Sequence, residues 1–372
     1  MPQDPTREQH DVVVIGAGQS GLAAGYHLAS AAIDHVILEA ASRVGDVWRS
    51  RYDSLRLYSP ARYDGLPGLP FPGDPMAFPS GAQMADYLET YATTFDLPVR
   101  SGVAVERLRV DADGPGYVVS GGGAEWPAAH VIVATGPFQR PYRPEFARDI
   151  DPRIQQIHSA DYRHPDQLAD GPVLVVGASH SGADIAYELA ASRRTYLSGR
   201  SHGQLPFSVE SRVARVTWPL LASVATRVLS LDTPIGRKMA PQVRKGGGPL
   251  LRHRKQDLID AGVEWSEART VGVTDGKPTL ADGEVLDVAC VLWCTGFRPD
   301  FSWIELPILA DDGWPSQERG VITSAPGLYI LGAPFLHSFA SMLVLGAGDD
   351  AAWVVEHIRA SRSSSTPAAM AA

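Results

Sequence analysis

The sequence predicts an α/β protein built from two dinucleotide-binding, Rossmann-like domains, with the second domain inserted into the first. Two glycine-rich turns after apolar strands predict this fold, one at Gly16–Gly21 and one at Gly177–Gly182. In addition, each turn is followed by a strand that ends in Thr-Gly, at Thr135-Gly136 and at Thr295-Gly296. The first glycine and the Thr-Gly glycine are 120 residues apart in the first unit and 119 apart in the second. The two units therefore share one plan.

The first turn carries the pattern G-x-G-x-x-G directly after the apolar strand Val12–Ile15. Gly16 permits the tight turn, Gly18 lets a pyrophosphate approach the backbone, and Gly21 lets the following helix pack on the strand. The helix N-terminus supplies N–H groups and a positive dipole end for phosphates. The next strand ends on Glu39, 21 positions after Gly18, where a carboxylate accepts ribose hydroxyls. This turn predicts a dinucleotide with an unphosphorylated ribose, as in FAD.

The second turn repeats this pattern after the strand Val173–Val176, with Ser179 in place of the middle glycine. Arg200 follows Ser179 by 21 positions and therefore occupies the place that Glu39 has in the first unit. A carboxylate there would repel a 2′-phosphate, whereas an arginine suits one. The second unit is therefore expected to bind NADPH. The alternative is a surface arginine beside two neighbouring arginines.

Length and composition fit a globular protein of two or three domains. The chain has 372 residues, of which 44% are hydrophobic and 20% charged. The net charge of −9 argues against a general nucleic-acid binder. The two cysteines, Cys290 and Cys294, form C-x-x-x-C in an apolar strand, which is neither a redox C-x-x-C nor a zinc site. We expect buried structural thiols and no metal site.

The chain carries no apparent targeting or membrane-spanning segment. Residues 1–11 are polar and lack an apolar signal-peptide core. No apolar run reaches the roughly 18 residues that a membrane span needs. We therefore expect a cytoplasmic protein with no transmembrane segment, and an oligomer is compatible with the sequence.

Several further elements are expected between and after the two turns. The proline- and glycine-rich stretch from Pro60 to Pro79 is also aromatic, which is typical of an ordered irregular loop. Ser80 and Gln83 form a capping-box pattern that opens a helix reaching about Phe95. Strands are expected over 99–110, 116–120 and 130–136, and a last helix over 350–360.

The domain boundaries follow from these elements. The first domain is expected over 10–163 and 292–360, the second over 164–291, and a disordered tail over 361–372. The second domain carries a helical insertion over 201–248, which has an apolar part followed by a basic, glycine-rich part. It is interpreted either as a lid or substrate-access element, which could touch a membrane surface, or as a helical pair packed on its own domain. We favour the second interpretation.

At this point the motifs resemble those of the flavin-containing monooxygenases over nearly the whole chain. The resemblance is carried by G-A-G-Q-S-G-L, G-x-x-W-R, H-S-x-x-Y, the second glycine motif and C-T-G-F-R-P-D, at Gly16–Leu22, Gly45–Arg49, His158–Tyr162, Gly177–Gly182 and Cys294–Asp300. The chain is most similar to short bacterial members, which also resemble the plant YUCCA-type indolepyruvate monooxygenases.

The resemblance implies FAD in the first domain and NADPH in the second. In this family NADPH reduces FAD, and O2 then gives a C4a-hydroperoxyflavin that oxygenates a small organic substrate at a nitrogen, sulfur or carbonyl centre. The implied partners are thus a small-molecule substrate and O2. An NADPH-dependent flavin reductase or dehydrogenase without oxygenation is the alternative, and a non-catalytic cofactor-binding sensor is a third.

The family's cofactor contacts can be carried over onto matching positions. In the first domain they are Gly16, Gly18, Gln19, Ser20, Gly21, Glu39, Val47, Trp48, Val105 and Thr135. In the second domain they are Gly177, Ser179, His180, Ser181, Arg200, Thr295 and Gly296. Tyr58 stands where N- and S-oxygenating members have an asparagine beside the flavin, and it is our candidate catalytic residue. Its phenol is expected either to donate a hydrogen bond to flavin-bound oxygen or to line the pocket.

Overall fold

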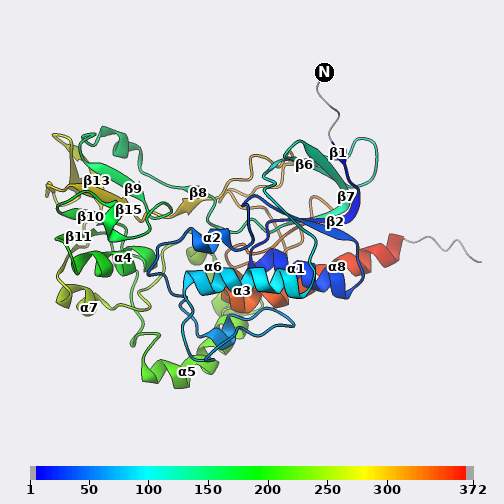
Figure 1. Ribbon diagram of the computed structural model, residues 1–372, viewed down its shortest axis with the longest axis horizontal. Helices are drawn as coiled ribbons and strands as arrows, with labels where there is room; N and C mark the ends of the chain where they lie inside the picture. Colours follow the sequence, from blue (N-terminus) through cyan, green and yellow to red (C-terminus); the bar gives the residue numbers. More distant parts are fainter. Residues whose placement is uncertain (1–5, 366–372) are drawn as a thin grey trace, which may run out of the picture.

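The computed structural model describes residues 6–365, whose two large β-sheets lie side by side (Figure 1). The first sheet has the order β4-β3-β2-β7-β6-β5, and β1 and β17 also pair with β7. Its strands are β1 (Thr6–Arg7), β2 (His10–Ile15), β3 (His35–Glu39), β4 (Val99–Ser101), β5 (Val105–Val110), β6 (Tyr117–Gly121), β7 (Ala124–Val133) and β17 (Leu328–Ile330). This sheet carries the first glycine turn.

Strand β7 forms both antiparallel and parallel pairs. Its first half runs antiparallel to β6, with Tyr117 opposite Ala128. Its second half lies parallel between β2 and β17, with Val131 opposite both Val13 and Leu328. The last four residues of β2 are apolar and fully buried, because helices and strands cover both faces of the sheet there.

Four helices belong to the first unit. They are α1 (Gln19–Ser30), α2 (Asp46–Arg49), α3 (Gly81–Thr94) and α8 (Val344–Ser365), with short 3-10 turns η1 (Ala61–Tyr63) and η5 (Phe339–Met342). Helix α1 packs against α8 and α3, and the three lie together along the first sheet (Figure 1). The predicted capping box is confirmed, because the Gln83 N–H donates to Ser80 Oγ (3.1 Å) and the Ser80 N–H donates to Gln83 Oε1 (2.8 Å).

The second sheet is entirely parallel, in the order β12-β11-β10-β15-β9. Its strands are β9 (Gln155–His158), β10 (Val173–Val176), β11 (Thr195–Ser198), β12 (Val263–Ser266) and β15 (Cys290–Trp293). Around it lie α4 (His180–Ala190), α7 (Lys255–Asp260), the hairpin of β13 (Thr270–Thr274) and β14 (Lys277–Leu280), and the turns η2 (Glu145–Asp149) and η3 (Pro165–Gln167). The two-unit α/β fold predicted from the sequence is confirmed.

The chain crosses between the two units at a short two-stranded ribbon. Strand β8 (Arg140–Pro141) pairs antiparallel with β16 (Phe297–Arg298), so the outgoing and returning connections run side by side. The position of this ribbon between the sheets is visible in Figure 1. The second unit is therefore inserted into the first through two adjacent crossings.

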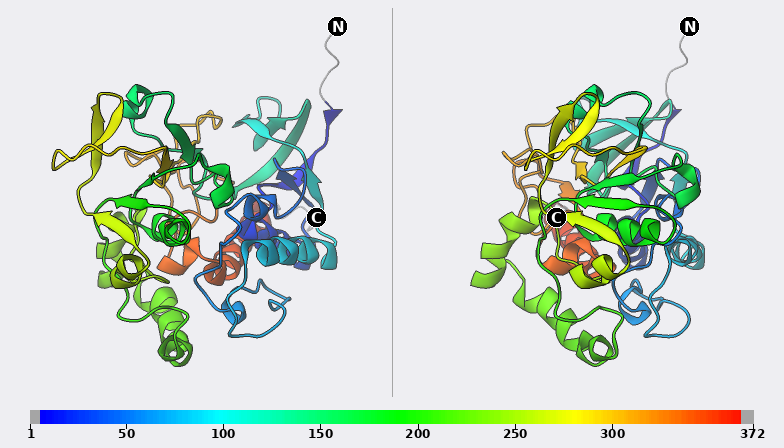
Figure 2. Two further views of the ribbon diagram at one scale, coloured as in Figure 1. Left: turned by 60° about the vertical axis from the view of Figure 1, so that its left-hand side comes forward. Right: turned by 90° about the vertical axis from the view of Figure 1, so that its left-hand side faces the viewer.

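The insertion consists of α5 (Arg212–Ser223), a π-helical turn η4 (Val224–Val228) and α6 (Pro234–Arg244). It leaves the second unit and reaches the first, as the views of Figure 2 show. Backbone hydrogen bonds join Leu231 N to His337 O and Phe339 N to Leu229 O, both at 2.8 Å. The expectation that this helical pair packs on its own domain is wrong, because its backbone pairs with residues 337–339 of the first unit.

Three of the predicted boundaries also differ from those in the structure. Strand β9 pairs with β15 in the second sheet, so residues 155–158 and 292–293 lie with the second unit rather than the first. The expected strand over 99–110 is two strands, because at Gly102 (φ +76°) the chain leaves the edge of β3 and turns toward β6. Helix α8 starts at Val344 and continues to Ser365, so residues 361–365 are helical, and residues 366–372 of the expected tail lie outside the described part.

Candidate cofactor-binding site

The first glycine turn has the geometry that its pattern predicts. A Cβ at Gly16 (φ +106°) would lie 2.7 Å from the Ala134 carbonyl oxygen, and one at Gly21 would lie 1.8 Å from the Gly16 oxygen. Neither position can hold a side chain. A Cβ at Gly18 meets no atom within 4 Å, so this position faces open space. Gly18 is also the N-cap of α1 and makes no side-chain cap, which leaves the first N–H groups of the helix for an anion.

Glu39 is held beside this turn at the end of β3. One carboxylate oxygen accepts a hydrogen bond from Ala17 N (2.7 Å) and the other accepts one from Ala41 N (2.9 Å). Each oxygen keeps a further lone pair, which could accept from a ribose hydroxyl. Val103 N donates to the Glu39 carbonyl oxygen (2.9 Å), so the start of β5, where Val105 stands, lies next to this strand end.

Helix α2 carries the two other expected contacts of the first unit. Gly45 is its N-cap in a left-handed conformation (φ +87°), and a Cβ there would lie 2.5 Å from the Ala85 carbonyl oxygen of α3. Val47 is 47% exposed, and Trp48 packs partly buried against the first core. Arg49 Nη2 donates a hydrogen bond to Asp86 Oδ1 of α3 (2.9 Å). The glycine and the ion pair fix α2 on α3 and leave Val47 accessible.

The second glycine turn repeats the first. A Cβ at Gly177 (φ +109°) would lie 2.3 Å from the Cys294 carbonyl oxygen, and one at Gly182 would lie 1.8 Å from the Gly177 oxygen. Ser179 is the N-cap of α4, yet its side chain does not cap the helix. Instead, Ser179 Oγ accepts from Gly248 N (2.9 Å) and lies 3.2 Å from the Gly248 oxygen.

A short segment, residues 245–249, crosses this turn, and we call it the glycine strap. A Cβ at Gly248 would lie 2.4 Å from His180 Cε1, and one at Gly247 would lie 2.8 Å from His202 Cε1. The strap fits between the two imidazoles only because these residues lack side chains. Burial lowers the pKa of His180, which stays neutral beside the helix N-terminus at pH 7.

Arg200 lies at the carboxyl end of β11, where the sequence places it. Gly199 directly before it packs on the turn, since its Cβ would lie 3.1 Å from Ala178 N. The Arg200 side chain is exposed, and among residues 6–365 it has no ion-pair partner. An exposed guanidinium beside a phosphate-binding turn suits a 2′-phosphate.

Each Thr-Gly turn lies beside a glycine turn, since a Cβ at Gly16 would lie 3.5 Å from Thr135 Cα and one at Gly177 would lie 2.3 Å from the carbonyl oxygen of Cys294. Gln139 Nε2 donates to Thr135 Oγ1 (2.9 Å), and Thr295 Oγ1 donates to the Tyr142 carbonyl oxygen. His158 is buried, its Nε2 lies 3.1 Å from the Gly296 oxygen, and its Nδ1 accepts from Ala160 N at 3.0 Å. Burial lowers the pKa of His158, so this neutral histidine holds the second Thr-Gly turn.

Tyr58 lies between the two units. Its hydroxyl donates to Asp184 Oδ2 of α4 (2.8 Å), and its ring centroid lies 5.2 Å from that of His180. Because the phenol proton is engaged by Asp184, this geometry favours a lining and linking role over donation to flavin-bound oxygen. Asp184 was missed in the sequence, where an aspartate one turn into a helix gives no signal of its own.

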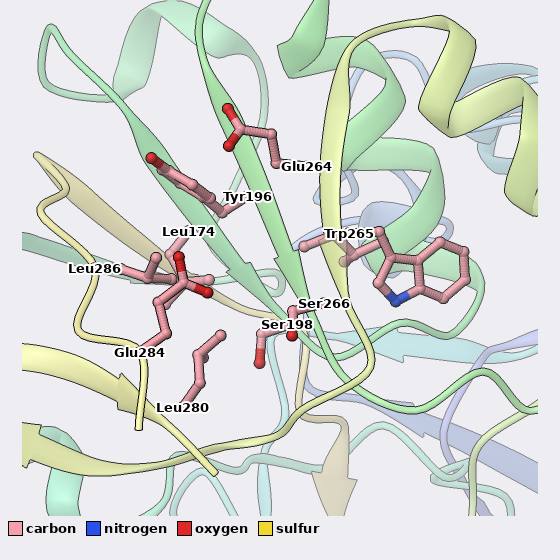
Figure 3. A pocket seen from close by; sticks show the side chains of 10 residues that line it. Leu174, Tyr196, Ser198, Glu264, Trp265, Ser266, Leu280, Glu284 and Leu286 are labelled. Carbon is pink, nitrogen blue, oxygen red and sulfur yellow. The ribbon is translucent and has the colours of Figure 1, made fainter. Parts of the chain in front are cut away.

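The cysteines and one cavity lie outside this site. Burial raises the pKa of both Cys290 and Cys294 to about 12, and both are free thiols. A cavity of about 200 Å³ is lined by Leu174, Tyr196, Ser198, Glu264 and other residues of the second unit (Figure 3). It lies on the sheet face away from α4, since Leu174 and Tyr196 belong to the core under β13–β14. It is therefore not part of the cofactor site.

Together, the fold and the paired turns define an oxidoreductase with two dinucleotide sites. The sequence pattern of the pyridine nucleotide-disulphide oxidoreductases matches residues 13–229, so the chain belongs to this family. The chain is 38% identical to an uncharacterized CzcO-like oxidoreductase of Geobacillus kaustophilus over 349 residues, 94% of this chain and 98% of the relative.

Two further relatives connect the chain to monooxygenases. It is 29% identical to the probable indole-3-pyruvate monooxygenase YUCCA7 of Arabidopsis thaliana, over 93% of this chain and 86% of that protein. The solved flavin-containing monooxygenase from Stenotrophomonas maltophilia superposes with a TM-score of 0.75 at 28% identity, covering 95% of this chain and 99% of that one. The resemblance stated from the sequence is confirmed. Among the described residues, no helix has the length and apolar character needed to span a membrane.

Proposed function

We propose that this chain is an NADPH-dependent FAD monooxygenase that acts on a small organic substrate. The observation that carries the proposal is the pair of matching glycine turns with opposite charges at equivalent strand ends, Glu39 in the first unit and Arg200 in the second. FAD supplies the chemistry that activates O2 once NADPH has reduced it. The protein's tasks are to bind both nucleotides, to orient them and to exclude water.

Each turn binds a nucleotide through the same groups. The open space at Gly18 and the uncapped N-terminus of α1 suit the FAD pyrophosphate, and Glu39 accepts from its ribose hydroxyls. At the second turn, the N-terminus of α4 suits the NADPH pyrophosphate and Arg200 suits its 2′-phosphate.

The second turn binds its nucleotide under the glycine strap. The strap lies against Ser179 and His180, next to the expected pyrophosphate position. A neutral His180 presents no charge to the phosphates, so the attraction comes from the helix N-terminus and Arg200.

The substrate is expected to react at a nitrogen, sulfur or carbonyl centre. Three aromatic side chains meet where α5 reaches the first unit: Trp218 lies 5.7 Å from Tyr63 and 6.3 Å from Phe78, centroid to centroid. This aromatic contact packs the loop of residues 60–79 against the insertion, which supports an access role for the insertion.

The cytoplasmic location expected from the sequence stays a prediction.

The test is anaerobic reduction of the purified flavoprotein, followed by turnover in air. The proposal expects bound FAD, reduction by NADPH in preference to NADH, and an oxygenated product with thioether, amine or ketone probes. Reduction by NADPH with all O2 recovered as hydrogen peroxide, for every probe, would favour the reductase alternative. A chain that binds both nucleotides without oxidising NADPH would favour the sensor.

A further inference from the structure

Arg252 lies where three segments of the chain meet. Its guanidinium donates from Nη1 to Asp184 Oδ2 (2.7 Å), from Nε to Glu210 Oε1 (2.7 Å), and from Nη2 to the carbonyl oxygens of Arg56 and Leu57 (3.0 Å each). The side chain is only 11% exposed. Arg252 thus directs four hydrogen bonds to a helix of the second unit, a loop of the first unit and the start of the insertion.

Asp184 completes the link from the other side. Its side chain is 8% exposed, and Oδ2 accepts from the Tyr58 hydroxyl at 2.8 Å as well as from Arg252. The Arg252 guanidinium carbon lies 4.9 Å from the centroid of the Tyr58 ring. A buried carboxylate with a guanidinium and a phenol as partners is fully engaged, so the three side chains hold one geometry.

The network sits next to the proposed NADPH phosphate site. Asp184 is four residues after His180, the first residue of α4, so it lies one turn below the helix N-terminus. The loop of residues 52–60 on the other side bridges both units, because Leu57 packs in the first core and Tyr52 in the second. The network therefore fixes the orientation of α4 relative to the first unit.

Both ends of the insertion converge on the same point. Glu210 stands just before α5 and Arg252 follows α6, and the two form an ion pair at 2.7 Å. A shift of the insertion would therefore displace Arg252, the residue that holds α4 in position. Among the described residues, 6–365, no other ion pair joins α4 to an arginine.

We propose that Arg252 is a positioning residue for hydride transfer between the two nucleotides. The inference rests on the proposed function. Each nucleotide binds at its own turn, but hydride transfer needs the nicotinamide and the flavin at contact distance and in one orientation. A misplacement of about 1 Å costs on the order of 100-fold in rate. Loss of the Arg252 link should slow flavin reduction and leave nucleotide affinity largely intact.

The experiment is anaerobic stopped-flow reduction of the FAD-loaded enzyme over a range of NADPH concentrations. It gives a limiting rate of reduction and an apparent Kd separately. For Arg252→Lys and Asp184→Asn we expect the limiting rate to fall about 10- to 100-fold with the Kd changed less than about 3-fold. Arg194→Lys is the matched control, because Arg194 makes an exposed pair with Glu264 (2.6 Å) at the far strand edge, and its rate should equal that of the wild type.

The outcomes separate this inference from the proposed function. Wild-type flavin that NADPH does not reduce would contradict the proposed function itself. A normal wild type with variants that reduce at the wild-type rate, or that lose affinity without losing rate, would overturn the role of Arg252. If Arg252→Lys fails to retain FAD, Asp184→Asn decides alone, because it keeps the shape of the side chain. A structural role alone would lower the melting temperature and leave the limiting rate unchanged.

Discussion

Glu39 is the last residue of β3 and Arg200 follows the end of β11 by two residues, so the two proposed nucleotide sites differ by a reversal of charge. The Glu39 carboxylate is fixed by two backbone N–H groups, whereas the Arg200 guanidinium is exposed. A fixed anion suits a permanently bound nucleotide with free ribose hydroxyls. An exposed cation suits a nucleotide that arrives with a 2′-phosphate and leaves again.

Arg200→Ala is expected to weaken NADPH and not NADH. A pair of charge-assisted hydrogen bonds to the 2′-phosphate contributes about 1.5–3 kcal/mol, which corresponds to about a 10- to 150-fold rise in the KM for NADPH. NADH, which has no 2′-phosphate, serves as the internal control in the same steady-state assay. Equal effects on both cofactors would contradict the assignment.

Gly248→Ala tests the glycine strap. The new methyl group would lie 2.4 Å from His180 Cε1 and 2.5 Å from Nε2, so the strap or the imidazole must shift at the start of α4. Overpacking of this kind costs about 1–3 kcal/mol, and we expect the Kd for NADPH to rise about 5- to 150-fold in a fluorescence titration. The control is Gly272→Ala in β13, where a Cβ meets nothing within 4 Å. Unchanged NADPH binding in Gly248→Ala would show that the strap does not form part of the site.

Asp64 is expected to make stability depend on pH. Burial raises the pKa of this fully buried carboxyl to about 7, so the folded chain binds its proton more tightly than the unfolded chain does. Its contribution is therefore complete below about pH 4 and is lost as the pH rises through 7. Asp64→Asn should raise the melting temperature relative to the wild type at pH 8 and flatten its dependence on pH.

The matched control for Asp64 is Asp53→Asn, because Asp53 lies in the same loop region and is exposed. It should leave the slope of melting temperature against pH as in the wild type. Thermal melts between pH 5 and 8.5 make the comparison. An Asp64→Asn variant with the slope of the wild type would mean that this carboxyl stays ionised throughout.

Trp218→Ala is expected to loosen the insertion. Trp218 is half-buried against the rings of Tyr63 and Phe78, and aromatic pairs of this kind contribute about 0.5–1.5 kcal/mol beyond burial. Limited proteolysis should cut within residues 201–248 at least about 3-fold faster than in the wild type. Leu220→Ala, at a side chain on the same helix that is 65% exposed, should not change the rate. Equal rates for both variants would contradict the docking role of Trp218.

Local patterns predicted the parts of the fold that depend on nearby residues. The glycine turns, the capping box of Ser80 and Gln83, and the acid and base at the two strand ends follow from spacings of a few to about 20 residues. Each has a steric or hydrogen-bonding reason within its own segment. The two-domain fold could then be predicted because this pattern occurs twice along the chain.

Contacts between distant residues could not be predicted in this way. Arg252 and Asp184 are 68 residues apart, and nothing in a basic, glycine-rich stretch indicates which arginine becomes buried. The same holds for the insertion, whose residues 229–231, between η4 and α6, pair with residues 337–339 more than 100 positions later. Strand β9 was assigned to the wrong unit because its partner, β15, lies 135 residues further along.

The most direct test of monooxygenase activity is turnover under ¹⁸O2 with NADPH and a panel of a thioether, a tertiary amine and a cyclic ketone. A monooxygenase is expected to give a product that contains one ¹⁸O atom per NADPH consumed, with little hydrogen peroxide released. Full consumption of NADPH with all of the ¹⁸O in hydrogen peroxide and none in any organic product would contradict it.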